Sequence, residues 1–156
     1  MKIYNEIFCS FTFGGEVASI AASLKVLEIL EKTDMLARME TNGRQLQDGF
    51  NALSKQAGLF PRFQCVGYPI WSLLKFRDAA GQDSMLERSL FQQEAVKRGI
   101  LQQVTHNLTA AHDHISTEQS LEIYAGVLKT LAAWLADANP ARFLEGPMIQ
   151  PVFRVR

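Results

Sequence analysis

The first residues whose types could do chemistry are Phe11-Thr12-Phe13-Gly14-Gly15, which stand just ahead of a stretch with helical spacing. Thr12 supplies a hydroxyl, the backbone supplies amides, and the two glycines supply flexibility. These are the parts needed to hold a phosphate at the positive end of a helix. An ordinary threonine cap, with glycines easing a tight turn, explains the same residues. Spacing alone favours that simpler interpretation.

A second group comprises His106, His112 and His114, with Asp113 among them. Imidazole and carboxylate groups are metal ligands, but this spacing is not that of a zinc site and no cysteine pair accompanies it. We therefore predict no metal site, and we assign no catalytic residue.

The chain ends in Arg154-Val155-Arg156. Arginines can grip a carboxylate or phosphate with two parallel hydrogen bonds if the terminus folds over a site. A terminus must be tied down to work in this way, so solvated arginines are the simpler expectation.

Composition limits the class of protein. The 156 residues are 47% apolar, enough for one ordinary domain with a core. Sixteen basic and sixteen acidic residues cancel, and neither sign forms a run, so we expect no nucleic-acid and no membrane partner. Cys9 and Cys65 lie far apart, no secretory leader is evident, and no apolar run approaches the roughly 20 residues of a membrane span. We expect a cytoplasmic protein.

The helices and strands that would position these residues are predicted from the spacing of apolar residues along the chain. Apolar residues three and four apart predict helices over residues 15–32 and 34–57, with Thr12 placed to cap the first and Gly58 to end the second. Residues 63–66 and 70–76 are rich in strand-forming types and flank a turn at residues 67–69.

The second half of the chain repeats this alternation. Ser84 and Glu87 have capping-box spacing and predict a helix over 84–98, which Gly99 ends. A third strand is predicted over 100–105. Ser116 and Gln119 repeat the box before a helix over 117–137, and a tail of residues 139–156 is expected to dock on something. The fold class is α/β or α+β, with helices packed on one small mixed or antiparallel sheet.

Several segments in this order resemble class III pyridoxal-phosphate (PLP) aminotransferases, in the branch similar to glutamate-1-semialdehyde 2,1-aminomutase. The resemblance covers essentially the whole chain. It is carried by the Thr12 motif, residues 21–36, residues 43–50, Gly67, Arg98-Gly99-Ile100-Leu101 and Leu108-Thr109-Ala110-Ala111-His112.

The resemblance implies the C-terminal portion of a fold-type I PLP enzyme. Residues 1–33 would be the end of the large domain with a connecting helix, residues 34–138 the small domain, and residues 139–156 a docking tail. Thr12, with the backbone amide of Phe11, would donate to the cofactor phosphate across a homodimer interface. His112 would shape the turn before the last helix or the entrance to the active site. The lysine that forms the Schiff base and the aspartate that pairs with the pyridine nitrogen lie upstream in relatives, so this chain would be inactive alone.

The substrate stays open between amino-acid and amino-sugar types. Glu16 stands where many relatives have asparagine, and residues 102–107 lack the Pro-Pro-Leu and Ser-x-x-Glu patterns that some relatives use at the substrate entrance.

Two other hypotheses compete with the enzyme fragment. One is a self-sufficient dimerisation or binding module that ignores the cofactor. The other, ranked last, is a metal-dependent hydrolase using the histidines, which lacks a recognisable third ligand and general base. The fragment hypothesis predicts exposed apolar surface on residues 15–32.

Overall fold

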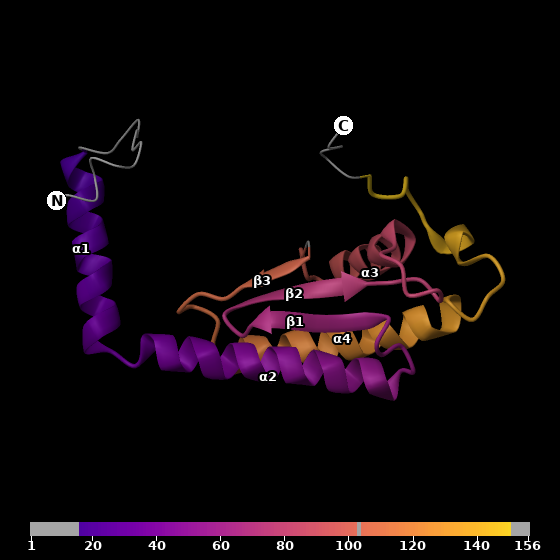
Figure 1. Cartoon of the computed structure of the whole chain (residues 1–156), viewed down its shortest axis with the longest axis horizontal. Coiled ribbons are helices and arrows are strands. Elements are labelled where there is room, and N and C mark those ends of the chain that lie inside the picture. The colour runs from indigo at the N-terminus through magenta and orange to yellow at the C-terminus, as the bar shows by residue number, and fades with distance from the viewer. Residues whose placement is uncertain (1–15, 103, 151–156) are drawn as a thin grey trace. The chain divides into compact units, whose positions relative to one another are not determined.

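The computed structural model describes residues 16–102 and 104–150. The chain divides into two compact units after Leu36. The elements in chain order are α1 (Val17–Lys32), α2 (Met35–Gln56), β1 (Phe63–Tyr68), β2 (Trp71–Phe76), α3 (Met85–Lys97), β3 (Thr105–Asn107), α4 (His114–Trp134) and the 3₁₀ helix η2 (Pro140–Phe143) (Figure 1).

In the first unit, α1 begins with a carboxylate cap. Glu16 has extended backbone angles, and its side chain accepts hydrogen bonds from the backbone N–H groups of Ala18 (3.0 Å) and Ser19 (2.6 Å). This satisfies two of the helix's otherwise unpaired amides. The expectation that Thr12 caps the helix is therefore wrong, because the helix starts at Val17 and Glu16 does this work.

No residue of α1 is buried, and its large apolar side chains other than Leu30 are exposed. Val17 is 77% exposed and Leu24 63%. The exposed apolar surface expected on residues 15–32 is thus confirmed for residues 17–32. A 16-residue helix is marginal in water by itself, because helical stability comes chiefly from packing an apolar face.

α2 has a buried stripe comprising Gly43, Leu46, Phe50 and Ser54, spaced three and four apart. Gly58 ends the helix in the left-handed region, at φ +70°, where its N–H donates to the carbonyl of Lys55. The predicted helix over 34–57 is confirmed.

The sheet has the order β1-β2-β3, and both strand pairs are antiparallel. β2 alternates between exposed and buried residues, so its Ser72, Leu74 and Phe76 face the core. Figure 1 shows α2 and α4 running alongside the strands, and buried residues of α2, α3 and α4 form one cluster with those of β1 and β2. The fold is α+β with a small antiparallel sheet.

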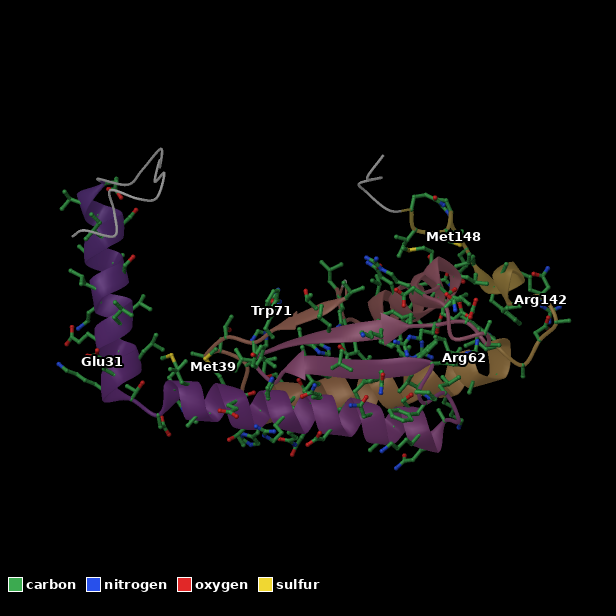
Figure 2. All side chains as sticks on the ribbon, in the orientation of Figure 1. Glu31, Met39, Arg62, Trp71, Arg142 and Met148 are labelled. Carbon is green, nitrogen blue, oxygen red and sulfur yellow. The ribbon has the colours of Figure 1, made fainter. Side chains whose placement is uncertain are left out.

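The opposite face of the sheet has aromatic and aliphatic side chains in register. Tyr68 pairs with Trp71, and Val66 pairs with Leu73. Tyr68 is 79% exposed, Trp71 60% and Leu73 40%. Figure 2 marks the position of Trp71. We call this set, Val66, Tyr68, Trp71 and Leu73, the outer face.

Two elements, the third strand and the last helix, have boundaries that differ from the sequence prediction. The third strand is Thr105–Asn107, not residues 100–105, because the Ile100 N–H still bonds to the Ala95 carbonyl in the turn that ends α3. The chain first meets β2 where the Leu74 N–H donates to the Val104 carbonyl (2.7 Å).

The last helix begins at His114 because Asp113 caps it, accepting from the Ser116 N–H (2.8 Å). The second capping box is therefore wrong, and the helix ends at Trp134 instead of residue 137.

Of the two hydrogen bonds expected for the first capping box, at Ser84 and Glu87, only one forms. The Ser84 hydroxyl oxygen accepts from the Glu87 N–H, as expected for an N-cap. Glu87 does not return the bond to the Ser84 amide. Its carboxylate accepts from the Ser84 hydroxyl and from Arg62 (3.0 Å), while the Ser84 N–H donates to the Phe76 carbonyl (2.9 Å). This arrangement fastens the start of α3 to the end of β2.

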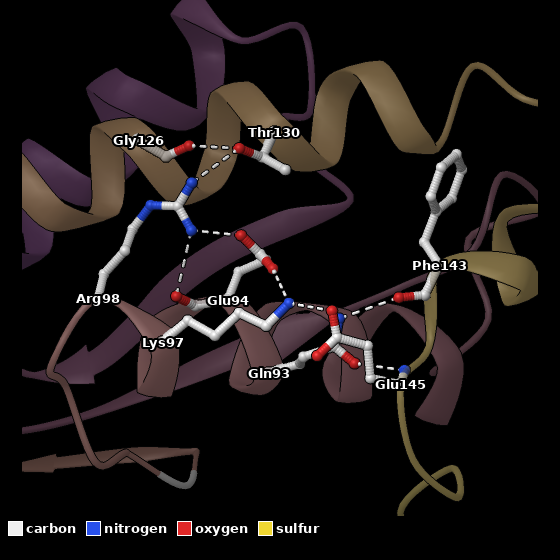
Figure 3. A network of polar contacts seen from close by, with 8 residues as sticks. All are labelled: Gln93, Glu94, Lys97, Arg98, Gly126, Thr130, Phe143 and Glu145. Carbon is white, nitrogen blue, oxygen red and sulfur yellow. Dashed lines mark hydrogen bonds and ion pairs between the residues drawn. The ribbon is translucent and has the colours of Figure 1, made fainter.

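The described part of the tail lies against α3 and α4. The Gln93 side chain donates to the Phe143 carbonyl (2.9 Å) and accepts from the Glu145 N–H (2.9 Å). Figure 3 shows how this joins an ion-pair network, in which Lys97 contacts Glu94 and Glu145 and Arg98 bridges Glu94 to Thr130 of α4. The Phe143 ring also stacks on Trp134, with centroids 4.9 Å apart.

None of the helices in residues 16–102 and 104–150 is both long and apolar enough to cross a membrane.

Gly43→Ala is expected to destabilise the fold. Alanine normally favours a helix over glycine by about 1 kcal/mol. Here, however, a Cβ on Gly43 would lie 2.2 Å from the backbone oxygen of Pro69, so the turn between β1 and β2 would have to move. We expect a net loss of about 1–3 kcal/mol in urea denaturation. Gly146→Ala is the control, because nothing lies within 4 Å of its Cβ position. A stabilised Gly43→Ala variant would show that α2 does not press on the turn.

Candidate functional site

A pocket of about 500 Å³ lies between the loop after α3, strand β3 and the first turns of α4. Its polar lining includes Gln102, Thr105, His106, Ser116 and Tyr124. Leu46, Ile100 and Leu108 form apolar parts of the wall. All of these residues belong to the second unit.

Strand register places His106 in this pocket. His106 is the middle residue of β3 and lies opposite Ser72 of β2, so both side chains point to the buried side of the sheet. The Ser72 Oγ lies 2.9 Å from His106 Nδ1, and the Tyr124 hydroxyl lies 2.9 Å from His106 Nε2. The Tyr124 hydroxyl in turn donates to the Gln102 side-chain oxygen.

With the Gln102 side-chain oxygen facing Tyr124, these contacts are consistent with one proton arrangement. If the Tyr124 hydroxyl donates to Gln102, it accepts from Nε2–H of His106, and Nδ1 then accepts from the Ser72 hydroxyl. His106 is therefore the neutral tautomer with its proton on Nε2, assigned from the hydrogen-bond chain.

Burial keeps the network uncharged. It lowers the pKa of His106 to about 4 and raises the pKa of Tyr124. Cys65, whose Sγ lies 3.7 Å from His106 Nδ1, has its pKa raised to about 11, chiefly by burial. A nucleophilic cysteine needs a thiolate and an accessible sulfur, whereas Cys65 is 1% exposed and protonated at neutral pH. The Cys65–His106 contact is thus structural, not a nucleophile and its base.

The structure does not bring the three histidines together as ligands. Only His106 is buried, whereas the His112 Nδ1 accepts from the Thr109 N–H (2.9 Å) in the turn before α4. Asp113 is occupied in capping that helix. Within the part of the chain that the structure describes, no group of three His, Cys, Asp or Glu side chains could hold a metal ion.

The pocket does not fit pyridoxal phosphate by itself. Its lining contains neither lysine nor arginine, so it offers no amine for a Schiff base and no cation for the phosphate. The two predicted phosphate donors, Thr12 and Phe11, lie outside the described residues, as does Arg154. This pocket therefore offers neither the amine nor the cation that the cofactor needs.

Sequence patterns did not identify the network of Ser72, His106, Tyr124 and Gln102. One signal was available, since Ser72 shares the inward side of β2 with the apolar Leu74 and Phe76. A polar residue at such a position needs a buried hydrogen-bond partner.

Comparisons of the chain with protein-family models, with curated proteins and with solved structures found no match.

Proposed function

We propose that this chain is the C-terminal portion of a PLP-dependent aminotransferase or aminomutase, similar to glutamate-1-semialdehyde 2,1-aminomutase. In the complete enzyme it would take part in amino-group transfer by completing the cofactor site and its surroundings. The Schiff-base lysine would come from a large domain outside this chain. The chain alone would be inactive.

The observation that carries this proposal is the exposed apolar surface of α1. This helix directly follows the Thr12 segment, has exposed Val17, Ile20, Leu24 and Leu27, and has no buried residue. Such a helix needs an apolar partner to be stable. A connecting helix that packs on a large domain or a second subunit meets that need.

The pocket at His106 contains no amine and no cation, which agrees with a Schiff-base lysine supplied by a large domain outside this chain. The aminotransferase chemistry would be supplied by the large domain, and PLP, when bound there, would act as the electron sink. The Thr12 hydroxyl and the Phe11 amide would donate to its phosphate across a homodimer interface. Two neutral donors ahead of a helix suit an anion without a lysine. The substrate would be of the amino-acid or amino-sugar type.

Thr12 variants test the phosphate role in the enzyme reconstituted with a large domain. Thr12→Val removes the hydroxyl at nearly constant volume, and one hydrogen bond to a charged phosphate is worth about 1.5–3 kcal/mol. We expect PLP affinity to fall by about tenfold to a hundredfold, measured by fluorescence titration. Thr12→Ser keeps the hydroxyl and should bind within about threefold of the parent. Equal affinity for Thr12→Val and the parent would remove Thr12 from the cofactor site.

The second candidate is a non-catalytic dimerisation or binding module. The exposed apolar residues of α1, and separately those of the outer face, favour it, because such surfaces also suit self-association. It predicts a well-defined oligomer whose stability and mass do not respond to PLP, which sedimentation with and without the cofactor would measure.

A further inference from the structure

A second hollow of the molecule, apart from the pocket at His106, is strongly cationic. A groove of about 310 Å³ lies between the end of β2 and the start of α3. Its lining contains Lys75, Arg77 and Arg88, against a single acidic residue, Asp83. The groove therefore has a formal charge of about +2, in a chain whose total formal charge is zero.

The local fold explains why these cations converge. Lys75 and Arg77 are two residues apart along β2 and its continuation, so their side chains project from the same side. The Ser84 N–H holds the start of α3 to the Phe76 carbonyl (2.9 Å). Arg88 lies one helical turn further on, and helical side chains lean back toward the N-terminus. Arg88 is thereby directed to the end of β2.

These cations are poorly neutralised within the described residues. The Nε of Arg88 is buried and has no hydrogen-bond partner there. The Arg77 Nε lies 3.9 Å from an oxygen of Asp83, whose side chain is 89% exposed, so this ion pair is weak. Lys75 has no ion pair among the described residues. A buried guanidinium N–H without an acceptor costs free energy, and an anion beside the guanidinium would offset part of this cost through its charge.

We propose that this groove binds the phosphate group of a phosphomonoester ligand. A phosphomonoester has a charge of about −1.5 to −2 at neutral pH, which matches the uncompensated charge of the groove. The guanidinium of Arg88 presents paired donors that suit two phosphate oxygens, and Lys75 and Arg77 add charge. The positive end of α3 contributes in the same direction. Leu73, Met85 and Val104 offer apolar wall to the rest of the ligand.

This site is independent of the proposed cofactor role. It uses residues of β2 and α3, not Thr12, and it is present in the chain alone. If the groove does not bind phosphate, the aminotransferase proposal is unaffected. If Thr12 has no role in cofactor binding, the groove proposal is likewise unaffected.

Titration of the full chain with inorganic phosphate at neutral pH tests the proposal, with the arginine Nε–H signals followed by NMR. We expect a saturable shift of the Arg88 signal at millimolar phosphate. Lys75→Met alters an exposed side chain, so it should fold normally, and it should weaken binding by roughly threefold to tenfold. Arg88→Met should weaken binding by roughly tenfold or more.

The matched control is Arg44→Met, which removes the same charge from α2, where Arg44 is paired with Glu40. It should bind phosphate within about twofold of the parent. Acetate, a monoanion, should bind at least roughly fivefold more weakly than phosphate. Non-saturating shifts, an equal effect of Arg44→Met and Lys75→Met, or acetate binding as tightly as phosphate would each overturn the proposal.

Discussion

Phe50→Ala is expected to lower the free energy of unfolding by about 3–5 kcal/mol, the range for deleting a large buried aromatic side chain. Phe50 is fully buried, and its ring makes edge contacts with Phe91 (centroids 5.9 Å apart) and Tyr124 (5.4 Å). These three rings join α2, α3 and α4 in one cluster, so the cavity would open where all three helices meet. Urea denaturation of parent and variant measures the loss.

Trp71→Ala is the control for this variant. It deletes a larger side chain, but Trp71 is 60% exposed on the outer face. We expect it to cost about 1 kcal/mol or less. If Trp71→Ala cost as much as Phe50→Ala, the outer face would be covered in solution, and a second copy of the chain would be the first candidate to cover it.

The stability of the protein is expected to fall by about 3 kcal/mol as the pH drops from about 6.5 to about 4, through His106 alone. Burial lowers the pKa of His106 to about 4, so the unfolded state binds the proton more tightly than the folded state. The stabilisation is present in full above the unfolded pKa and is lost as the pH falls toward the folded pKa. Urea denaturation at a series of pH values follows this loss.

Two variants separate His106 from the carboxylates that also titrate at low pH. His106→Gln removes the imidazole, so the difference between parent and variant should change by about 3 kcal/mol across this interval. Tyr124→Phe removes one hydrogen-bond partner but keeps the imidazole buried, so the pH dependence should persist. Parallel pH curves for parent and His106→Gln would mean that His106 is solvated in the folded protein.

Periodicity predicts the long elements well because their apolar faces are regular. The stripe of α2 and the alternation of β2 are both legible in the sequence, and both elements form where they were expected. The errors are at caps and at the third strand. A strand-like run at residues 100–105 is overridden because the turn that ends α3 still holds Ile100 through the Ala95 carbonyl. Glu16 and Asp113 outcompete Thr12 and Ser116 as caps, and only the geometry of the helix start decides this competition.

The candidate site was less accessible to sequence reasoning. His106 was noted for its neighbours in sequence, His112 and Asp113, whereas its actual partners are Ser72 and Tyr124, 34 and 18 residues away. Only strand register and helix packing bring these side chains together. The same holds for the cationic groove, which Arg77 and Arg88 both line because the Ser84 N–H holds the start of α3 to the end of β2.

We propose that this chain completes a PLP site whose Schiff-base lysine lies outside it. This proposal is tested most directly by titrating PLP into the purified chain, with and without the large domain of an aminotransferase of this class. The absorbance band of the Schiff base and mass mapping after borohydride reduction are the readouts. The titration uses the Lys75→Met chain, because PLP is itself a phosphomonoester and Lys75 lines the cationic groove. We predict no specific lysine adduct on this chain alone, and tight PLP binding once the large domain is added. A specific adduct on another lysine of the isolated chain would contradict the proposal, and the absence of both adduct and rescue would favour the dimerisation module.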